Sequence, residues 1–119
     1  MPLTILYAED NRPVSDAACD LLESEGWRVE LSADGNAALN KLAGAFDYDL
    51  LLLDNDLPGA SGVELARYAR NLRCYRRTPI IMLSARDCEE EAKRAGVDLF
   101  LRKPDGMWML VESIRRLIE

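Results

Sequence analysis

Acidic residues stand directly after two apolar segments of this chain. Glu9 and Asp10 follow residues 3–8, and Asp54 follows the four consecutive leucines at 50–53. The leucine segment is too short to cross a membrane and is typical of a strand buried on both faces. A carboxylate at the end of such a strand is costly to desolvate unless another group compensates its charge. What surrounds Asp54 therefore decides its chemistry.

Two further apolar segments end in groups that could compensate the carboxylates. Ser84 follows residues 79–83, and Lys103 follows residues 97–102. Clustered carboxylates repel one another by about 3 kcal/mol per pair at about 5 Å, and a hard divalent cation such as Mg2+ relieves that repulsion through oxygen ligands. A carboxylate nucleophile, a metal ion, an ammonium and a hydroxyl together meet the needs of phosphoryl transfer, in which an aspartate can accept the group covalently.

The elements that must position these residues are visible in the apolar pattern, which alternates between short runs typical of strands and longer runs with helical spacing. Strands are predicted over residues 3–8, 27–31, 50–53, 79–83 and 97–102. Each strand precedes a helix. The first helix begins at Pro13 and ends near Gly26, and the second is capped by Ser32 or Asp34 and ends near Gly44. The third is capped by Ser61, and the last two span 87–95 and 107–118.

This alternation predicts an α/β doubly wound fold, a five-stranded parallel sheet with helices on both faces and right-handed crossovers. In the strand order 2-1-3-4-5, the second strand is an edge and the four polar strand ends are neighbours. One helix is weakly held, because the segment 86–95 offers only Cys88, Ala92 and Ala95 at helical spacing. We expect that helix to be a movable element of low stability.

The composition fits one soluble domain, since 49% of the 119 residues are hydrophobic and 30% are charged. The net charge of −6 argues against nucleic acid or an anionic membrane as a partner. The absence of histidine excludes histidine-based metal sites and Ser-His or Cys-His catalysis. Cys19, Cys74 and Cys88 form no CxxC pair, and free thiols together with the absence of a signal peptide or transmembrane segment predict a cytoplasmic protein.

Five features of the chain resemble the receiver domain of bacterial two-component response regulators. They are the acidic pair Glu9-Asp10, Asp54 with Pro58 four residues on, the pair Ser84-Ala85, the aromatic Phe100, and Lys103-Pro104. Order and spacing both match, and the resemblance spans essentially the whole chain. It implies a flavodoxin-like fold and a single receiver domain over residues 1–119, a signalling module rather than an enzyme.

The resemblance also implies the acceptor and the metal ligands. Asp54 would be the phosphoacceptor, and its donor would be a phosphohistidine on a sensor histidine kinase or a histidine phosphotransfer protein. Glu9, Asp10 and Asp54 would hold Mg2+ through their side chains, and Asp56 would contribute its backbone carbonyl. The domain would assist its own Mg2+-dependent phosphorylation and dephosphorylation.

Ser84 and Lys103 would grip the phosphoryl group, and Phe100 would be the switch residue whose rotamer follows Ser84. The helix 87–95, the strand 97–102 and the last helix would then present the signal. A downstream effector protein, a fused output domain or a second copy of the chain would bind that face, with no direct binding of nucleic acid or membrane by this domain. A cis peptide bond is expected at Lys103-Pro104.

Two positions depart from the family pattern. Asp105 follows Lys103-Pro104 where an aromatic residue is common, so we expect the last loop to pack in its own way. Phe100 stands where tyrosine is frequent, so a switch hydroxyl is missing.

A further hypothesis concerns Asp56 and Arg86, which lie two residues after Asp54 and Ser84. As an exposed pair worth at most ~1 kcal/mol, they would hinder the attacking water and slow dephosphorylation severalfold.

Three other functions compete with this interpretation. Asp54-Asn55-Asp56 resembles the paired aspartates of haloacid-dehalogenase-type phosphatases, although that motif usually follows the first strand of a longer chain. A flavodoxin-like FMN carrier needs a first loop rich in hydroxyls and glycine, whereas Glu9 and Asp10 would repel a phosphate that lacks a metal. A degenerate receiver that only binds proteins is opposed by the intact acidic and basic positions.

Overall fold

The computed structural model describes residues 3–44 and 46–119. Five parallel strands form one sheet in the order β2-β1-β3-β4-β5, which confirms the predicted class and strand order. The strands are β1 (Thr4–Ala8), β2 (Arg28–Ser32), β3 (Leu50–Leu53), β4 (Ile80–Ser84) and β5 (Leu99–Arg102). The helices are α1 (Arg12–Glu23), α2 (Gly35–Ala43), α3 (Gly62–Asn71), α4 (Glu89–Arg94) and α5 (Leu110–Ile118).

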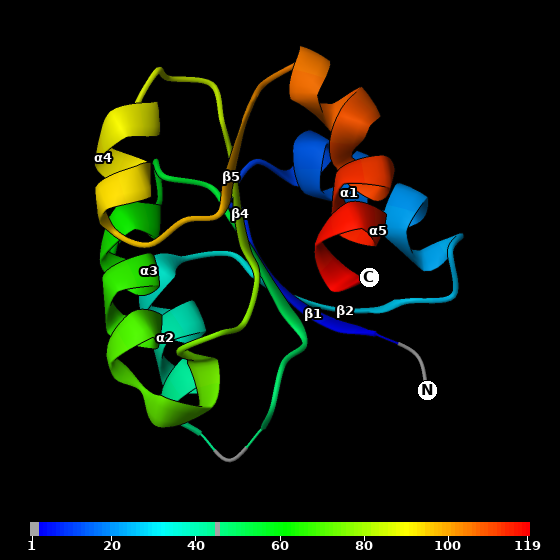
Figure 1. The fold of residues 1–119 in the computed structure, drawn as a ribbon. Coiled ribbons are helices and arrows are strands. Elements are labelled where there is room, and N and C mark those ends of the chain that lie inside the picture. The colour runs from blue at the N-terminus through cyan, green and yellow to red at the C-terminus, as the bar shows by residue number, and fades with distance from the viewer. Residues whose placement is uncertain (1–2, 45) are drawn as a thin grey trace.

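The sheet is the middle of three layers. Helices α1 and α5 cover one face, and α2, α3 and α4 cover the other (Figure 1). Because side chains alternate between the faces of a strand, Leu50 and Leu52 pack in the apolar core under α1 and α5, while Leu51 and Leu53 pack in the core on the opposite face. The leucine run is therefore buried on both sides, as its composition predicts, and holds Asp54 at the end of the central strand.

Local capping explains where α2 and α3 begin. The side chain of Asp34 accepts a hydrogen bond from the backbone N–H of Ala37 at 2.7 Å, so Asp34 caps α2, whereas Ser32 is the last residue of β2. Ser61 and Glu64 form a reciprocal capping box at the start of α3. These caps fix the helices that follow the second and third strands.

The last helices differ from the sequence-based expectation. α4 spans six residues and buries only Ala92, so it is even shorter than the predicted helix 87–95. The predicted helix 107–118 is divided, because a 3-10 helix, Asp105–Met109, precedes α5. The Lys103-Pro104 peptide bond is cis, as expected. Within residues 3–44 and 46–119, none of the helices has the length and apolar character that spanning a membrane requires.

Candidate functional site

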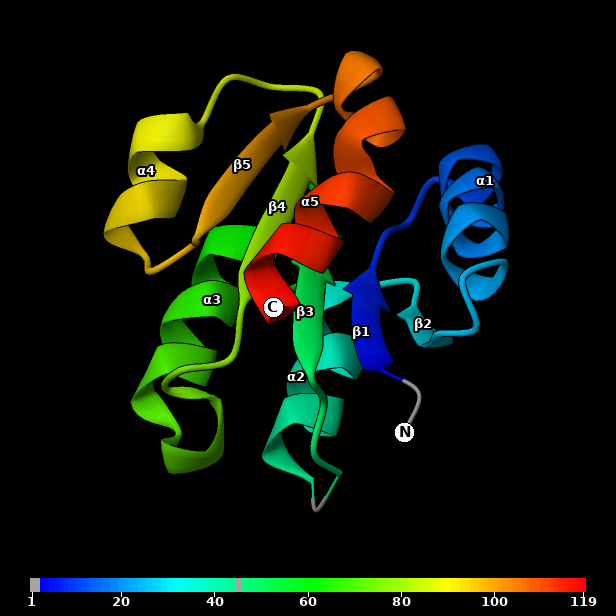
Figure 2. The same cartoon turned by 45° about the vertical axis from the view of Figure 1, so that its right-hand side comes forward.

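Three carboxylates gather at the carboxyl edge of the sheet, the edge toward which the strand arrows point in Figure 2. One oxygen each from Glu9, Asp10 and Asp54 lies within 4.8 Å of the other two. Glu9 and Asp54 are only 2% and 4% exposed, and Asp10 is open to solvent. The structure thus brings together the acidic residues that the sequence placed on two strand ends. Their oxygen atoms are the ligands that Mg2+ prefers in proteins.

Lys103 carries the charge that balances this cluster. Its Nζ lies 2.7 Å from Oε1 of Glu9 and 3.5 Å from Oδ2 of Asp54. Its backbone N–H donates to the carbonyl of Ser84 at 2.9 Å, which holds the end of β5 beside the end of β4. The predicted juxtaposition of Lys103 and Asp54 is present, although the closer carboxylate is that of Glu9.

The electrostatics of Asp54 follow from this placement. Burial and the neighbouring carboxylate of Glu9 raise the pKa of Asp54 to about 6, against the opposing effect of the Lys103 ammonium. A cation bound at this edge would favour the ionised carboxylate, which is the nucleophilic form.

The loop after Asp54 is clamped by residues that the sequence analysis did not single out. The buried side chain of Asn55 accepts a hydrogen bond from the Val63 N–H at 3.0 Å, and its carbonyl accepts one from Gly62 at 3.2 Å. A Cβ on Gly62 would lie 2.3 Å from the carbonyl oxygen of Asp54, so only glycine allows this approach. Two features of the sequence could have indicated this loop: Asn55 lies between two aspartates, and Gly62 directly follows the Ser61 cap.

Asp56 and Arg86 pair at the mouth of the site. Asp56 Oδ1 lies 3.1 Å from an Arg86 guanidinium nitrogen, and both side chains are at least half exposed. The ion pair therefore connects the loop after β3 with the loop after β4, as the spacing of these residues suggested.

Ser84 and Phe100 lie on the side of the site that faces α4. Ser84 is fully buried at the end of β4, and its Oγ accepts a hydrogen bond from the Arg86 N–H at 3.3 Å. Phe100 is half-buried against the core that α2, α3 and α4 cover. It pairs with Met82 in the register of β4 and β5. Phe100 is therefore a packing residue next to the strand that carries Ser84.

Comparison with known proteins identifies this arrangement. Residues 5–115 match the response regulator receiver domain family. The chain belongs to this family. The receiver domain is 33% identical to the phosphate regulon transcriptional regulatory protein PhoB of Escherichia coli K12, over 99% of this chain and 52% of that protein. It thus spans about half the length of the curated relatives it matches.

Solved receiver structures have the same architecture. The chemotaxis response regulator CheY4 of Vibrio cholerae superposes with a TM-score of 0.89 at 28% identity, covering 98% of this chain and 99% of that one. The receiver domain of the sensor histidine kinase PA1611 from Pseudomonas aeruginosa PAO1 was solved with a magnesium ion coordinated in its active site cleft. It superposes with a TM-score of 0.85 at 34% identity, covering 99% of this chain and 98% of that one.

These matches bear on two of the alternatives left open by the sequence, the phosphatase and the FMN carrier. The flavodoxin-like fold class and the membership of a two-component signalling family are both confirmed. The phosphatase and FMN-carrier alternatives find no support, because the matched family is a signalling receiver family rather than a family of classical enzymes. The acidic cluster of this receiver domain fits a Mg2+ and phosphoaspartate site.

Proposed function

We propose that residues 1–119 form one receiver domain that accepts a phosphoryl group on Asp54 from a phosphohistidine of a sensor histidine kinase or a histidine phosphotransfer protein. The observation that carries this proposal is the grouping of Asp54 with two further carboxylates and the ammonium of Lys103 at one edge of the sheet. In the transfer, a carboxylate oxygen of Asp54 forms a bond to phosphorus as the bond between phosphorus and the histidine nitrogen breaks. The product is an acyl phosphate.

Mg2+ is the cofactor that the donor set supports. The side chains of Glu9, Asp10 and Asp54 and the backbone carbonyl of Asp56 would hold it, and the fixed loop after Asp54 supports this ligand set. When bound, the ion neutralises charge on the transferred phosphoryl oxygens. Residues of the chain bind the same phosphoryl oxygens, since Lys103 supplies an ammonium and Ser84 a hydroxyl donor to them. The domain in this way assists its own phosphorylation and dephosphorylation.

The face formed by α4, β5 and α5, which we call the signalling face, changes on phosphorylation and binds the downstream partner. Ser84 moves toward the phosphoryl group, Phe100 follows it, and α4 shifts. This proposal is supported by the packing of Phe100 beside β4 and by the single buried residue of α4. An effector protein, a fused output domain or a second copy of the domain binds there, and the domain itself contacts neither nucleic acid nor membrane. A cytoplasmic location agrees with its free cysteines.

Incubation with Mg2+ and acetyl phosphate tests the proposal. We expect a single labile adduct with the mass of one phosphoryl group, absent in Asp54→Ala and absent when EDTA removes the metal. Asp20→Ala, which removes an exposed carboxylate of α1, serves as the matched control and keeps the adduct. An adduct that survives in Asp54→Ala, or none in the unaltered protein, would refute the proposal.

Dimerisation through the signalling face has its own measurement. Sedimentation of the protein with and without Mg2+ and beryllofluoride, a phosphoryl mimic, should show association only with the mimic. A monomer under both conditions leaves an effector or output domain as the partner of that face and removes the second copy from the proposal.

A further inference from the structure

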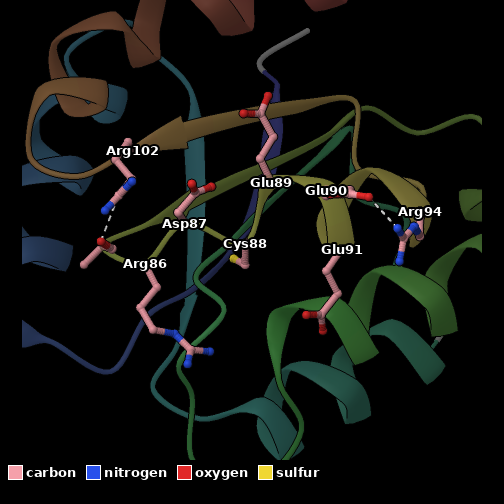
Figure 3. A pocket seen from close by; sticks show the side chains of 9 residues that line it. Arg86, Asp87, Cys88, Glu89, Glu90, Glu91, Arg94 and Arg102 are labelled. Atoms are coloured by element: carbon pink, nitrogen blue, oxygen red, sulfur yellow. Dashed lines mark hydrogen bonds and ion pairs between the residues drawn. The ribbon is translucent and has the colours of Figure 1, made fainter.

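Cys88 occupies an unusual place beside the site. It immediately precedes α4, and Figure 3 shows it between the loop that carries Arg86 and the first turn of the helix. Charged residues surround it on an open groove of about 630 Å3. Its side chain is half-buried and packs against the apolar core under α4.

The thiol of Cys88 makes two contacts that reach into strand β4. Its Sγ lies 4.0 Å from Oγ of Ser84 and 3.8 Å from the sulfur of Met82. Met82 is the register partner of Phe100 on the neighbouring strand. Cys88 therefore connects the start of α4 with the hydroxyl at the site and with the strand segment beside Phe100.

Within residues 3–44 and 46–119, the hydrogen-bond partners of the Ser84 hydroxyl come from the α4 side. The hydroxyl is fully buried, and it accepts a hydrogen bond from the Arg86 N–H while lying within reach of the Cys88 thiol. Both partners belong to the segment that leads from β4 into α4. A thiol is a weak donor, so this contact can be given up at small cost.

The same contact links the start of α4 to strand β4, beside the small apolar surface that the helix buries. Ala92 is the one residue that α4 itself buries within the described chain. A helix with so small an apolar anchor depends on the contacts at its ends. Releasing Cys88 from Ser84 would therefore loosen the start of α4.

We propose that Cys88 is a positioning residue for Ser84, whose thiol holds the Ser84 hydroxyl on the α4 side in the resting protein and loses that contact when Ser84 turns toward a phosphoryl group on Asp54. The inference rests on the proposed function. Phosphorylation thus loosens the first turn of α4 by removing the contact between the Cys88 thiol and the Ser84 hydroxyl. The accessibility of the Cys88 thiol then depends on the position of the Ser84 side chain.

Thiol labelling gives a direct readout, because the chain contains three free cysteines. N-ethylmaleimide labelling is followed residue by residue by mass spectrometry, before and after phosphorylation with Mg2+ and acetyl phosphate. We expect the labelling rate of Cys88 to rise about two- to fivefold, the range set by a weak hydrogen bond. Cys74, exposed in the turn before β4, and Cys19 on α1 are internal controls whose rates stay constant.

The two proposals fail in distinguishable ways. The intact mass of each sample reports whether Asp54 carries the phosphoryl group. A phosphorylated protein in which Cys88 labels at its resting rate relative to Cys74 overturns the role of Cys88 and leaves the proposed function standing. A protein that forms no adduct overturns both.

Substitutions separate positioning from simple packing. Cys88→Ala should raise the initial rate of phosphorylation by acetyl phosphate about two- to fivefold, because Ser84 loses a resting partner. Cys88→Ser, which keeps a hydrogen-bonding group, should restore the unaltered rate, and Cys74→Ala should leave it unchanged. In a Ser84→Ala background, Cys88→Ala should have no further effect. Additive effects in that double variant would show a packing role and overturn the inference.

Discussion

Lys103 and Glu9 form an ion pair, with 2.7 Å between Nζ and Oε1, although 94 residues separate them in the chain. The Glu9 carboxylate is fully buried, and the Lys103 side chain is only 13% exposed. A buried charge that loses its partner is expensive, far more so than an exposed one. Lys103 is therefore both a proposed phosphoryl ligand and the compensating charge of the metal-free site.

Lys103→Met should destabilise the metal-free protein. Removing the ammonium leaves Glu9 and Asp54 as neighbouring buried carboxylates, and we expect the free energy of unfolding to fall by about 3 kcal/mol. Urea titration at neutral pH in EDTA measures it. Lys41→Met is the matched control, because its pair with Glu30 is longer, at 3.9 Å, and more exposed. Equal losses in the two variants would show that the Glu9 pair is effectively solvated.

Asp54→Asn should have the opposite effect at neutral pH. The pKa of Asp54 is raised from 3.8 to about 6 by burial first and by Glu9 second, so between these pH values the folded state holds a proton that the unfolded state has lost. The contribution of Asp54 to the stability of the unaltered protein therefore falls as pH rises from about 4 to 6, and the charged carboxylate is destabilising above that range. Above that range the substitution should stabilise the protein by at most about 3 kcal/mol.

Urea titrations in EDTA across this pH range check the prediction. The gain should shrink toward acidic pH, where Asp54 is protonated in both states, and saturating Mg2+ should reduce it by stabilising only the unaltered protein. A pH-independent gain would point to a packing effect instead of to the charge.

Arg86→Ala should shorten the lifetime of the phosphorylated form. Without its partner, Asp56 no longer closes the mouth of the site, so water reaches the acyl phosphate more easily. An exposed pair contributes at most about 1 kcal/mol, which limits the change to severalfold. The decay of the phosphoryl adduct, followed by intact mass after removal of acetyl phosphate, gives the half-life.

The control for this variant is Arg94→Ala, which breaks an ion pair of similar exposure with Glu90 on α4. Its half-life should match that of the unaltered protein. If Arg86→Ala also leaves the half-life unchanged, the pair has no part in dephosphorylation.

Hydrogen exchange in residues 86–102 should respond to beryllofluoride and Mg2+. This segment contains α4, which buries one residue, and β5 with Phe100. We expect altered exchange there and constant exchange in α1, on the opposite face of the sheet. An unchanged profile across the segment would exclude the relay from Ser84 to α4.

Much of this site could be predicted because its residues stand at the ends of strands. Parallel strands bring their carboxyl ends to one edge, so Glu9, Asp54, Ser84 and Lys103 had to meet there once the alternation of elements was recognised. The start of α5 could not be predicted in this way. Gly106 packs so closely that a Cβ would lie 2.7 Å from Cβ of Leu101, and that contact with β5 accompanies a 3-10 turn before the helix.

The sequence by itself determined the alternation of strands and helices, the strand ends that carry charge, and the Ser61 cap of α3, because these depend on residues close together in the chain. Only the tertiary structure decided that Lys103 lies nearer Glu9 than Asp54, that Asn55 clamps the acceptor loop, and that Cys88 reaches Ser84. Such contacts depend on how side chains from separate elements share a crowded edge. The spacing of residues along the chain does not determine which of these side chains touch, and close packing in the folded protein does.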